Sequence, residues 1–325
     1  MTSNLHNPLM RDPLTGPGYA DGVHVVGHGD PMSRRKLRRA IDRHADLVLL
    51  GDSSSTLTSL PDGVVQTVVT SPPYWSLRDY EKEEHLGRAE PLPVFLKSLV
   101  GLFDEVRRVL SDDGTIWVNI GDSFTSGNRG RRAPDRKNPA RAMSVRPSNP
   151  DGTKDKDLIG VPWRFALAMQ EAGWWVRSDI IWYKPNCQPE SVRDRPTRSH
   201  EHIFLFSKSE RYHYDVNAIR GPNDRRLRDV WEINTVGYHG AHFAVFPPEL
   251  VRRCILIGSR PGDYVLDPFL GSGTTGMVAR QEGRQFIGCE LNENYLPLIV
   301  DRIGDHAHQP RSTYSADVRA QRSGT

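Results

Sequence analysis

The sequence predicts an α/β fold with a doubly wound, mostly parallel sheet. Short apolar strands alternate with amphipathic helices along the chain, which is the pattern of βαβ units. Two of the strands run directly into turns of unusual composition, one rich in proline and one rich in glycine. Such turns lie at the carboxyl edge of a parallel sheet, where doubly wound proteins bind their ligands.

The first half of the chain contains three expected strands and one helix. Residues 47–50 and 64–69 are apolar runs that end at Gly-Asp and at a double proline. A helix is expected near 95–110, because large apolar residues recur there at helical spacing. It stops at Asp-Asp-Gly, and residues 115–120 form the next strand.

The second half repeats the alternation. A helix near 163–172 is followed by strands at 176–183 and 202–206. The last unit is expected to comprise a helix at 248–257, a strand at 264–266, a glycine-rich turn, a helix at 274–282, a strand at 285–288 and a helix at 294–303.

Composition and length narrow the class of protein. The chain has 325 residues, and its 43 Lys and Arg nearly cancel 40 Asp and Glu, so net charge does not decide whether it binds nucleic acid. Cys187, Cys254 and Cys289 lack the close spacing of a disulfide framework or zinc site, and no metal is expected. Without an apolar run that could form a signal peptide or membrane span, we expect a cytoplasmic protein that does not contact membranes.

The composition divides the chain into one domain and several polar segments. Residues 1–32 are expected to be a loosely ordered extension, 33–304 the main domain and 305–325 a disordered tail. The basic run at 34–39 fits either a DNA contact or the polar face of a helix. Two further polar segments interrupt the main domain: a basic insertion at 124–156, with nine Lys and Arg against three Asp, and an Arg-rich stretch at 208–240.

The glycine-rich turn at 267–276 is a candidate cofactor site. Gly271, Gly273 and Gly276 spell G-x-G-x-x-G, and glycines allow positive φ and a close approach of backbone to ligand. The following helix begins at Thr274 and offers free N–H groups. Glu290, at the end of the next strand, could accept hydrogen bonds from ribose hydroxyls.

The flanking residues favour S-adenosylmethionine over a dinucleotide. No Lys follows Gly273, which argues against a phosphate-gripping P-loop. Asp267 would repel a pyrophosphate but attract the cationic methionine end of S-adenosylmethionine, and Phe269 adds an aromatic side chain. A nicotinamide-dependent oxidoreductase remains an alternative, because the glycine spacing alone fits it too.

The second candidate turn has the sequence Ser71-Pro72-Pro73-Tyr74. Its prolines stiffen the chain and remove two N–H donors, which leaves the Ser71 hydroxyl and backbone carbonyls as acceptors. Acceptors that bind both N–H groups of an exocyclic amine would draw its nitrogen toward sp³ geometry and aim the lone pair at a methyl sulfonium. Tyr74 could stack on a base extruded from the duplex. Methyl transfer by in-line displacement would need positioning but no covalent intermediate.

These two turns together resemble those of the amino-methylating DNA methyltransferases, in the group whose catalytic motif precedes the cofactor motif. The Ser-Pro-Pro-Tyr turn matches the catalytic motif, and residues 269–273 match the F-x-G-x-G cofactor motif. Stretches at 51–52, 182–186, 200–201 and 242–247 are similar too. The resemblance covers roughly residues 45–303. It implies a Rossmann-like methyltransferase sheet, circularly permuted so that the cofactor strand comes late, and it places Asp52 near the adenine of the cofactor.

The resemblance also indicates which base is methylated. Ser as the first letter of the motif is commoner in enzymes that methylate cytosine N4, and Asp or Asn in those that methylate adenine N6. We therefore expect cytosine N4, with adenine N6 as the alternative. Methylation at cytosine C5 needs a nucleophilic cysteine, usually after proline, and no Pro-Cys occurs.

The expected partner is double-stranded DNA, and a cognate restriction endonuclease is a further partner that the sequence leaves open. Phosphate anchors and base readers are expected in the two Arg-rich segments. The alternatives are a silent DNA-binding protein, or RNA or small-molecule methylation, and the chain could be a monomer or a homodimer. The candidate DNA-binding residues are Arg129, Arg131, Arg132, Arg136, Lys137, Arg225, Arg226 and Arg228.

Overall fold

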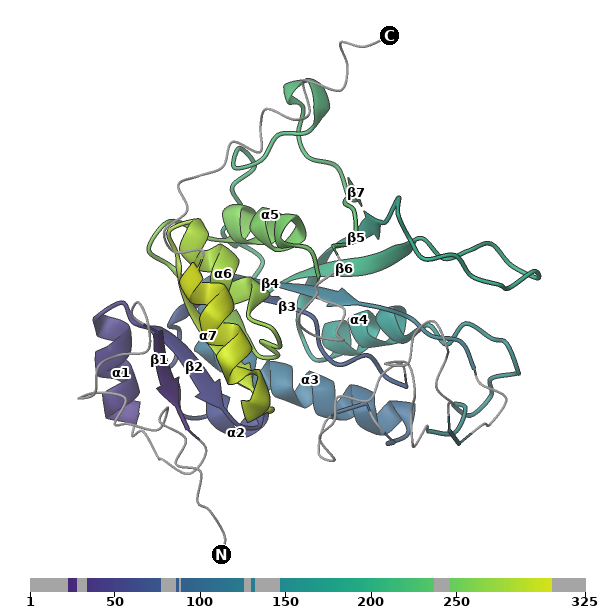
Figure 1. Ribbon diagram of the computed structural model, residues 1–325, viewed down its shortest axis with the longest axis horizontal. Helices are drawn as coiled ribbons and strands as arrows, with labels where there is room; N and C mark the ends of the chain where they lie inside the picture. The colour runs from purple at the N-terminus through teal and green to yellow at the C-terminus, as the bar shows by residue number, and fades with distance from the viewer. Residues whose placement is uncertain are drawn as a thin grey trace, which may run out of the picture.

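In the part of the chain that the structure describes, a sheet of nine strands forms the centre of the molecule (Figure 1). The computed structural model describes residues 23–27, 34–76, 86–87, 89–125, 130–131, 147–236 and 246–305. The strand order is β1-β2-β9-β8-β3-β4-β6-β5-β7. The strands are β1 (Val23–Val26), β2 (Asp46–Leu50), β3 (Val65–Thr70), β4 (Leu110–Ile120), β5 (Trp175–Tyr183), β6 (His200–Ser207), β7 (Val230–Glu232), β8 (Tyr264–Asp267) and β9 (Gln285–Glu290).

The sheet is mostly parallel, as the sequence predicts. Among the described strands, β6 alone runs against the others and pairs antiparallel with β4 and β5, whereas each remaining neighbouring pair is parallel. Reversing one strand has a consequence for the site. It brings the start of β6 to the same edge as the carboxyl ends of β4 and β5.

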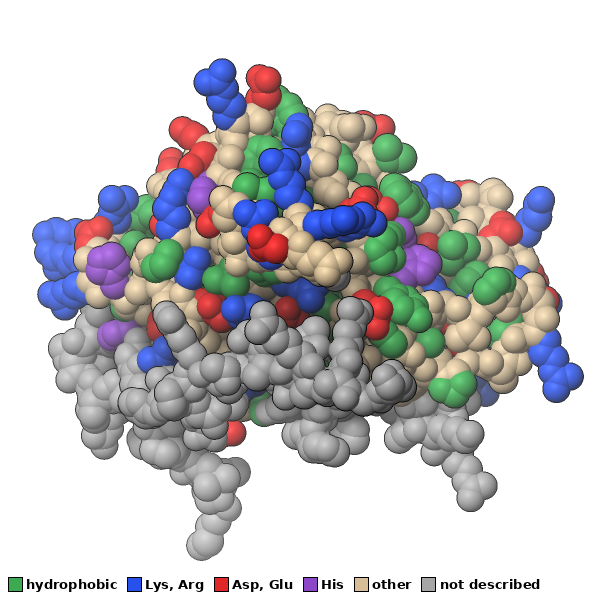
Figure 2. Space-filling view, turned by 90° about the horizontal axis from the view of Figure 1, so that it is seen from above, with side chains coloured by type: hydrophobic (Ala, Val, Ile, Leu, Met, Phe, Trp, Pro, Cys, Tyr) green, Lys and Arg blue, Asp and Glu red, His purple; other side chains and the backbone are tan. Residues whose placement is uncertain are grey.

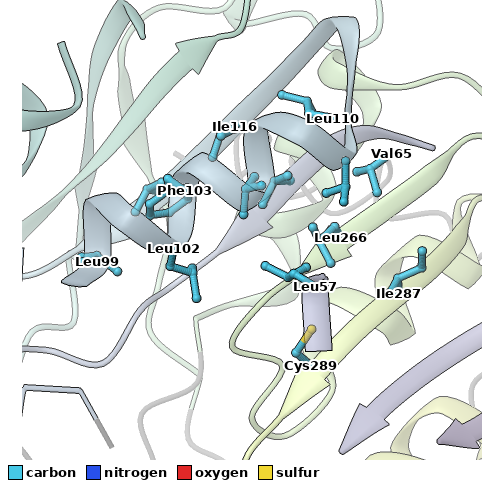
Figure 3. Close-up of a cluster of buried hydrophobic side chains, with 14 of the residues drawn as sticks. Leu57, Val65, Leu99, Leu102, Phe103, Leu110, Ile116, Leu266, Ile287 and Cys289 are labelled. Carbon is cyan, nitrogen blue, oxygen red and sulfur yellow. The ribbon is translucent and has the colours of Figure 1, made fainter. Parts of the chain in front are cut away.

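Helices cover both faces of the sheet and bury two apolar clusters. The helices are α1 (Arg34–Asp42), α2 (Ser53–Leu57), α3 (Leu92–Val109), α4 (Val161–Glu171), α5 (Pro248–Gly258), α6 (Thr274–Gln281) and α7 (Leu296–Asp305), with short 3₁₀ helices η2 (Pro222–Asp224) and η3 (Glu293–Tyr295). One cluster packs α1 to α4 on the sheet and includes Phe103 and Phe165. Figure 3 shows part of it, where Phe103 and Leu102 of α3 lie near Leu57 and Leu266. The other cluster contains Cys254, Val278 and Ile299 from α5 to α7.

The helices that follow the two central strands lie on opposite faces of the sheet. Strand β3 leads into α3 on one face, and its neighbour β8 leads into α6 on the other face. Helices that leave adjacent strands to opposite faces open a crevice beyond the carboxyl ends of those strands. The proline turn follows β3 and the glycine turn follows β8, so the two candidate turns meet at this crevice.

Each helix and strand that the sequence predicts is present within a few residues, but the N-terminal region differs. The extension expected to be loosely ordered contains β1, so the expectation for residues 1–32 is wrong at Val23–Val26, which pair in parallel with β2. The basic run at 34–39 lies in α1, with Arg38 and Arg39 exposed and Leu37 buried, so it forms a polar helix face. The expected tail beyond residue 305 lies outside the described residues. None of the described helices is long and apolar enough to cross a membrane.

Gly258 allows the end of α5 to approach the sheet closely. A Cβ at this position would lie 2.7 Å from Oγ1 of Thr67 and 2.9 Å from both Oγ1 of Thr115 and Nε1 of Trp117. We expect Gly258→Ala to lower the free energy of unfolding by about 1–3 kcal/mol, because the added methyl overpacks a buried contact. Urea denaturation measures the change.

The control is Gly101→Ala on the exposed face of α3, where an added Cβ has no neighbour within 4 Å. This control should raise stability by about 0.5–1 kcal/mol, since alanine loses less backbone entropy than glycine in a helix. Equal stability of the two variants would contradict the packing argument.

Candidate active site

Polar side chains from six strands meet at the carboxyl edge of the sheet. The ends of β3, β4, β5, β8 and β9 and the start of β6 supply them. Two groups form there: one surrounds the proline turn, and the other surrounds the glycine turn.

The proline turn leaves the sheet directly from β3. Pro72 is buried, and Ser71, Pro73 and Tyr74 are half-buried. The Ser71 hydroxyl donates a long hydrogen bond of 3.5 Å to the Tyr74 hydroxyl. The hydroxyl oxygen of Ser71 has two lone pairs that can accept hydrogen bonds, in line with the chemistry expected of this turn.

Tyr74 is held by side chains from two neighbouring strands. Its hydroxyl donates to Oε2 of Glu201 at 2.7 Å and lies 3.2 Å from Oδ1 of Asn119. The Asn119 amide donates to the same Glu201 oxygen at 3.1 Å and to the carbonyl of His202 at 3.2 Å. Asn119 lies near the end of β4, and Glu201 is the second residue of β6.

Lys184 completes this group by an ion pair with Oε1 of Glu201. Its ammonium also lies 4.2 Å from the centre of the Trp182 ring. Burial alone would raise the pKa of Glu201, but the charge of Lys184 and the hydrogen bonds from Lys184, Tyr74 and Asn119 hold that pKa below its ordinary value. Glu201 is therefore a carboxylate at neutral pH, able to accept the Tyr74 proton as a charge-assisted hydrogen bond.

The glycine turn has the geometry that its sequence predicts. Gly271 and Gly273 adopt φ values of 55° and 82°, in the left-handed region that glycine reaches without strain. A Cβ at Gly271 would have a single neighbour within 4 Å, so the space beside the backbone is open. Gly276 has a different role: a Cβ there would lie 2.9 Å from the Phe286 ring, so this glycine lets α6 pack on β9.

Asp267 connects the two turns. Its Oδ1 accepts hydrogen bonds from the Thr70 hydroxyl at 2.7 Å and the Phe269 amide at 3.0 Å, and its Oδ2 accepts from the Thr275 hydroxyl at 2.6 Å. Burial raises the pKa of Asp267 to about 6, although these hydrogen bonds favour the ionised form. The side chain is 1% exposed. It organises the turn from inside and does not present its carboxylate at the surface.

Glu290 lies on the other side of the glycine turn. Its Oε2 accepts from the Gly271 amide at 2.8 Å, and its Oε1 accepts from the Asn292 amide at 2.7 Å. Each oxygen keeps a lone pair for a further donor. Burial raises the pKa of Glu290 to about 7, opposed by hydrogen bonds from backbone amides, chiefly those of Asn292 and Gly271.

The other predicted cofactor residues fall around the same turn. Asp52 is exposed and caps α2 by accepting from the Ser54 and Ser55 amides at 3.0 and 3.2 Å. Phe269 is half-buried, and Thr274 is buried as the first residue of α6. Among the described residues, no cluster of His, Cys, Asp or Glu could hold a metal ion.

The predicted DNA-binding residues are only partly described. Arg225, Arg226 and Arg228 precede β7 and are exposed, and Arg131 is exposed in the basic insertion. Figure 2 views the molecule from the side of α5 and β7, and Lys and Arg side chains project from that face. The remaining predicted residues, Arg129, Arg132, Arg136 and Lys137, lie outside the described residues.

Sequence reasoning did not assign a site role to Asn119, Lys184 or Glu201. Lys184 and Glu201 lie in the stretches at 182–186 and 200–201 that resemble the methyltransferases, which is a signal that could have placed them at the site. Asn119 lies inside an apolar strand. Only its pairing partner and neighbouring strands reveal its place.

Two solved structures share the fold of this chain. The cytosine-N4-specific PvuII DNA methyltransferase superposes with a TM-score of 0.61 at 23% identity, over 78% of this chain and 85% of that chain. A protein from Thermus thermophilus, assigned as a DNA modification methylase and solved with S-adenosyl-L-methionine, gives a TM-score of 0.57 at 25% identity, over 81% and 96%.

Proteins that are similar in sequence to this chain are methyltransferases as well. Type II methyltransferase M.Cfr9I of Citrobacter freundii is 56% identical over 279 residues, which cover 84% of this chain and 93% of that protein. M.XycI of Xanthomonas campestris pv. cyanopsidis is 59% identical over 257 residues, or 78% and 86%. A family model of the N6/N4 type, described as DNA methylase, matches residues 65–301. The chain, with its proline turn and glycine turn joined through Asp267, therefore belongs to the DNA methylase family.

Proposed function

We propose that this protein transfers a methyl group from S-adenosyl-L-methionine to the N4 amine of cytosine at a specific sequence in double-stranded DNA. The observation that carries the proposal is the link through Asp267. This carboxylate bonds Thr70, next to Ser71, and also bonds Thr275 in the helix that follows the glycine turn. The acceptor for an amine and the turn for a cofactor are thereby fixed relative to one another.

The residues around the glycine turn fit S-adenosyl-L-methionine. Gly271 leaves open space beside the backbone, α6 begins at the turn, and Glu290 has lone pairs for ribose hydroxyls. Asp52 at the start of α2 and Phe269 complete the proposed contacts, and the buried negative charge of Asp267 lies beneath the turn. When bound, S-adenosyl-L-methionine supplies an electrophilic methyl group on a sulfonium.

The proline turn supports the other half of the reaction. Ser71 and the backbone carbonyls beside Pro72 and Pro73 accept the N–H groups of the amine, which localises the lone pair on its nitrogen. Tyr74 contacts the face of the extruded base. These residues accelerate transfer by positioning and by excluding water, so no covalent intermediate on the protein is required.

Ser71 favours cytosine N4 over adenine N6. This preference rests on the resemblance of the Ser-Pro-Pro-Tyr turn to N4-methylating enzymes. The relatives from Citrobacter and Xanthomonas are named Type II methyltransferases, and their identity over most of this chain supports a modification enzyme that works beside a cognate restriction endonuclease.

Ser71→Ala tests the proposed chemistry. We expect its methyl-transfer rate to fall by about 10²-fold, the typical loss when one preorganised hydrogen-bonding group is removed. Labelled methyl transfer to unmethylated DNA of varied sequence, followed by nucleoside mass spectrometry, measures the rate and identifies the base.

Ser98→Ala on the exposed face of α3 is the control and should keep the wild-type rate. N4-methylcytosine from the wild-type protein supports the proposal. N6-methyladenine would overturn the choice of base but keep the chemistry, and no labelled DNA would overturn the function.

The pH dependence of cofactor binding tests Glu290. Its pKa of about 7 means that its carboxylate ionises as the pH rises from 6 to 8. Charge-assisted hydrogen bonds are about twice as strong as neutral ones, so cofactor affinity should rise over this interval. Calorimetric titration at several pH values measures the affinity.

Glu290→Gln should bind more weakly at pH 8 and lose the part of the pH dependence that the carboxyl contributes. The titration of the cofactor itself is common to both proteins and cancels in the comparison. An identical pH profile for the two proteins would exclude Glu290 as a ribose ligand.

DNA binding tests the three exposed arginines before β7. We expect the triple change of Arg225, Arg226 and Arg228 to Ala to weaken DNA binding. The slope of log affinity against log salt should become shallower by about 0.9 for each phosphate that the protein no longer neutralises. Fluorescence anisotropy at several salt concentrations measures both.

Changing Arg35, Arg38 and Arg39 of α1 to Ala removes the same charge from the opposite end of the sheet (Figure 1). An equal loss in this control would mean that total charge matters and the location does not.

A further inference from the structure

We propose that Gly121 and Glu201 form a seat for Tyr74 that fixes the ring for stacking on the extruded base. The two residues position Tyr74 and do not contact the substrate themselves. The inference rests on the proposed function, because it concerns how the base is held during methyl transfer.

Gly121 holds the ring by its lack of a side chain. A Cβ at this position would lie 2.6 Å from Cε2, 3.0 Å from Cδ2 and 3.3 Å from Cζ of Tyr74, so the ring lies directly against the backbone. The φ of Gly121 is not positive, in contrast to Gly271 and Gly273. Backbone conformation therefore does not require glycine here, and the contact with Tyr74 does.

Glu201 holds the other end of the ring, through its bond to the hydroxyl. Its second oxygen is occupied by Lys184, and Asn119 donates to the oxygen that Tyr74 uses. A carboxylate restrained on both oxygens cannot turn away from the phenol. The hydroxyl is therefore restrained along the axis of the side chain.

The sheet places both parts of the seat at one level. The antiparallel pairing of β4 and β6 includes Ile120 opposite His202. Gly121 directly follows Ile120 at the end of β4, and Glu201 directly precedes His202 on β6. Tyr74 is half-buried, which leaves part of its side chain accessible. A ring restrained at one side and at its hydroxyl would offer a planar base a preformed stacking surface, which lowers the entropy cost of holding it.

A double-mutant cycle tests the seat at Gly121. In the wild-type background, an alanine Cβ would displace the ring by close to 1 Å, and a displacement of that size can cost about 10²-fold in rate. We expect Gly121→Ala to slow single-turnover methyl transfer to unmethylated DNA on this order while S-adenosyl-L-methionine affinity is unchanged. In a Tyr74→Ala background, where no ring opposes the new methyl, Gly121→Ala should cost nothing further.

A second cycle tests Glu201. Tyr74→Phe removes the hydrogen bond between the two side chains, and Glu201→Gln removes the charge that strengthens it. Each should slow the reaction, and the double variant should be no slower than the worse single variant, because both changes act on the same contact. Gly101→Ala and Glu210→Gln, both at exposed positions, are the controls.

The outcomes separate the inference from the proposed function. If the wild-type protein methylates DNA but Gly121→Ala has the wild-type rate, or costs the same with and without the Tyr74 ring, the seat is wrong. Full activity of Glu201→Gln would overturn its part in the seat. If the wild-type protein binds the cofactor and methylates no DNA, the proposed function itself fails.

Discussion

The site depends on one buried carboxylate shared between two neighbouring strands. Asp267 ends β8, and its oxygens bond Thr70 at the end of β3 and Thr275 in α6. Because hydrogen bonds to a charged group are stronger than neutral ones, this arrangement fixes the spacing of the two turns. The raised pKa of Asp267 reflects the free-energy cost of burying its charge, and three hydrogen-bond donors reduce that cost. Removing any one donor would leave part of that cost uncompensated.

Asp267, Glu290 and Glu201 differ in pKa because their partners differ. Burial dominates at Asp267 and Glu290, whose donors are neutral hydroxyls and amides, so their pKa values rise to about 6 and 7. At Glu201 the ammonium of Lys184 outweighs burial, and the pKa falls. Glu201 is therefore suited to a permanent structural charge, whereas Glu290 is suited to a contact that a ligand completes.

Local patterns were sufficient to predict seven of the nine described strands, most helices and both turns. Apolar periodicity depends on nearby residues, and the turn glycines and prolines carry their own conformational preferences. The edge strands β1 and β7 were missed because four and three residues give no usable periodicity. The link from Asp267 to Thr70 spans 197 residues of sequence, and no local pattern encodes such a distance. The glycine spacing alone also fitted a nicotinamide-dependent enzyme, and the family assignment was needed to decide.

Glycines at the site illustrate why a motif is only part of a site. Gly271 and Gly273 are needed because the backbone has a positive φ at both positions. This requirement produces a glycine spacing that can be recognised in the sequence. Gly121 has no such angle and lies in no motif. Its requirement arises from the Tyr74 ring, which approaches from the turn that follows another strand. Residues that serve a site by leaving room have no chemical signature in the sequence, and only the assembled sheet shows what occupies the space.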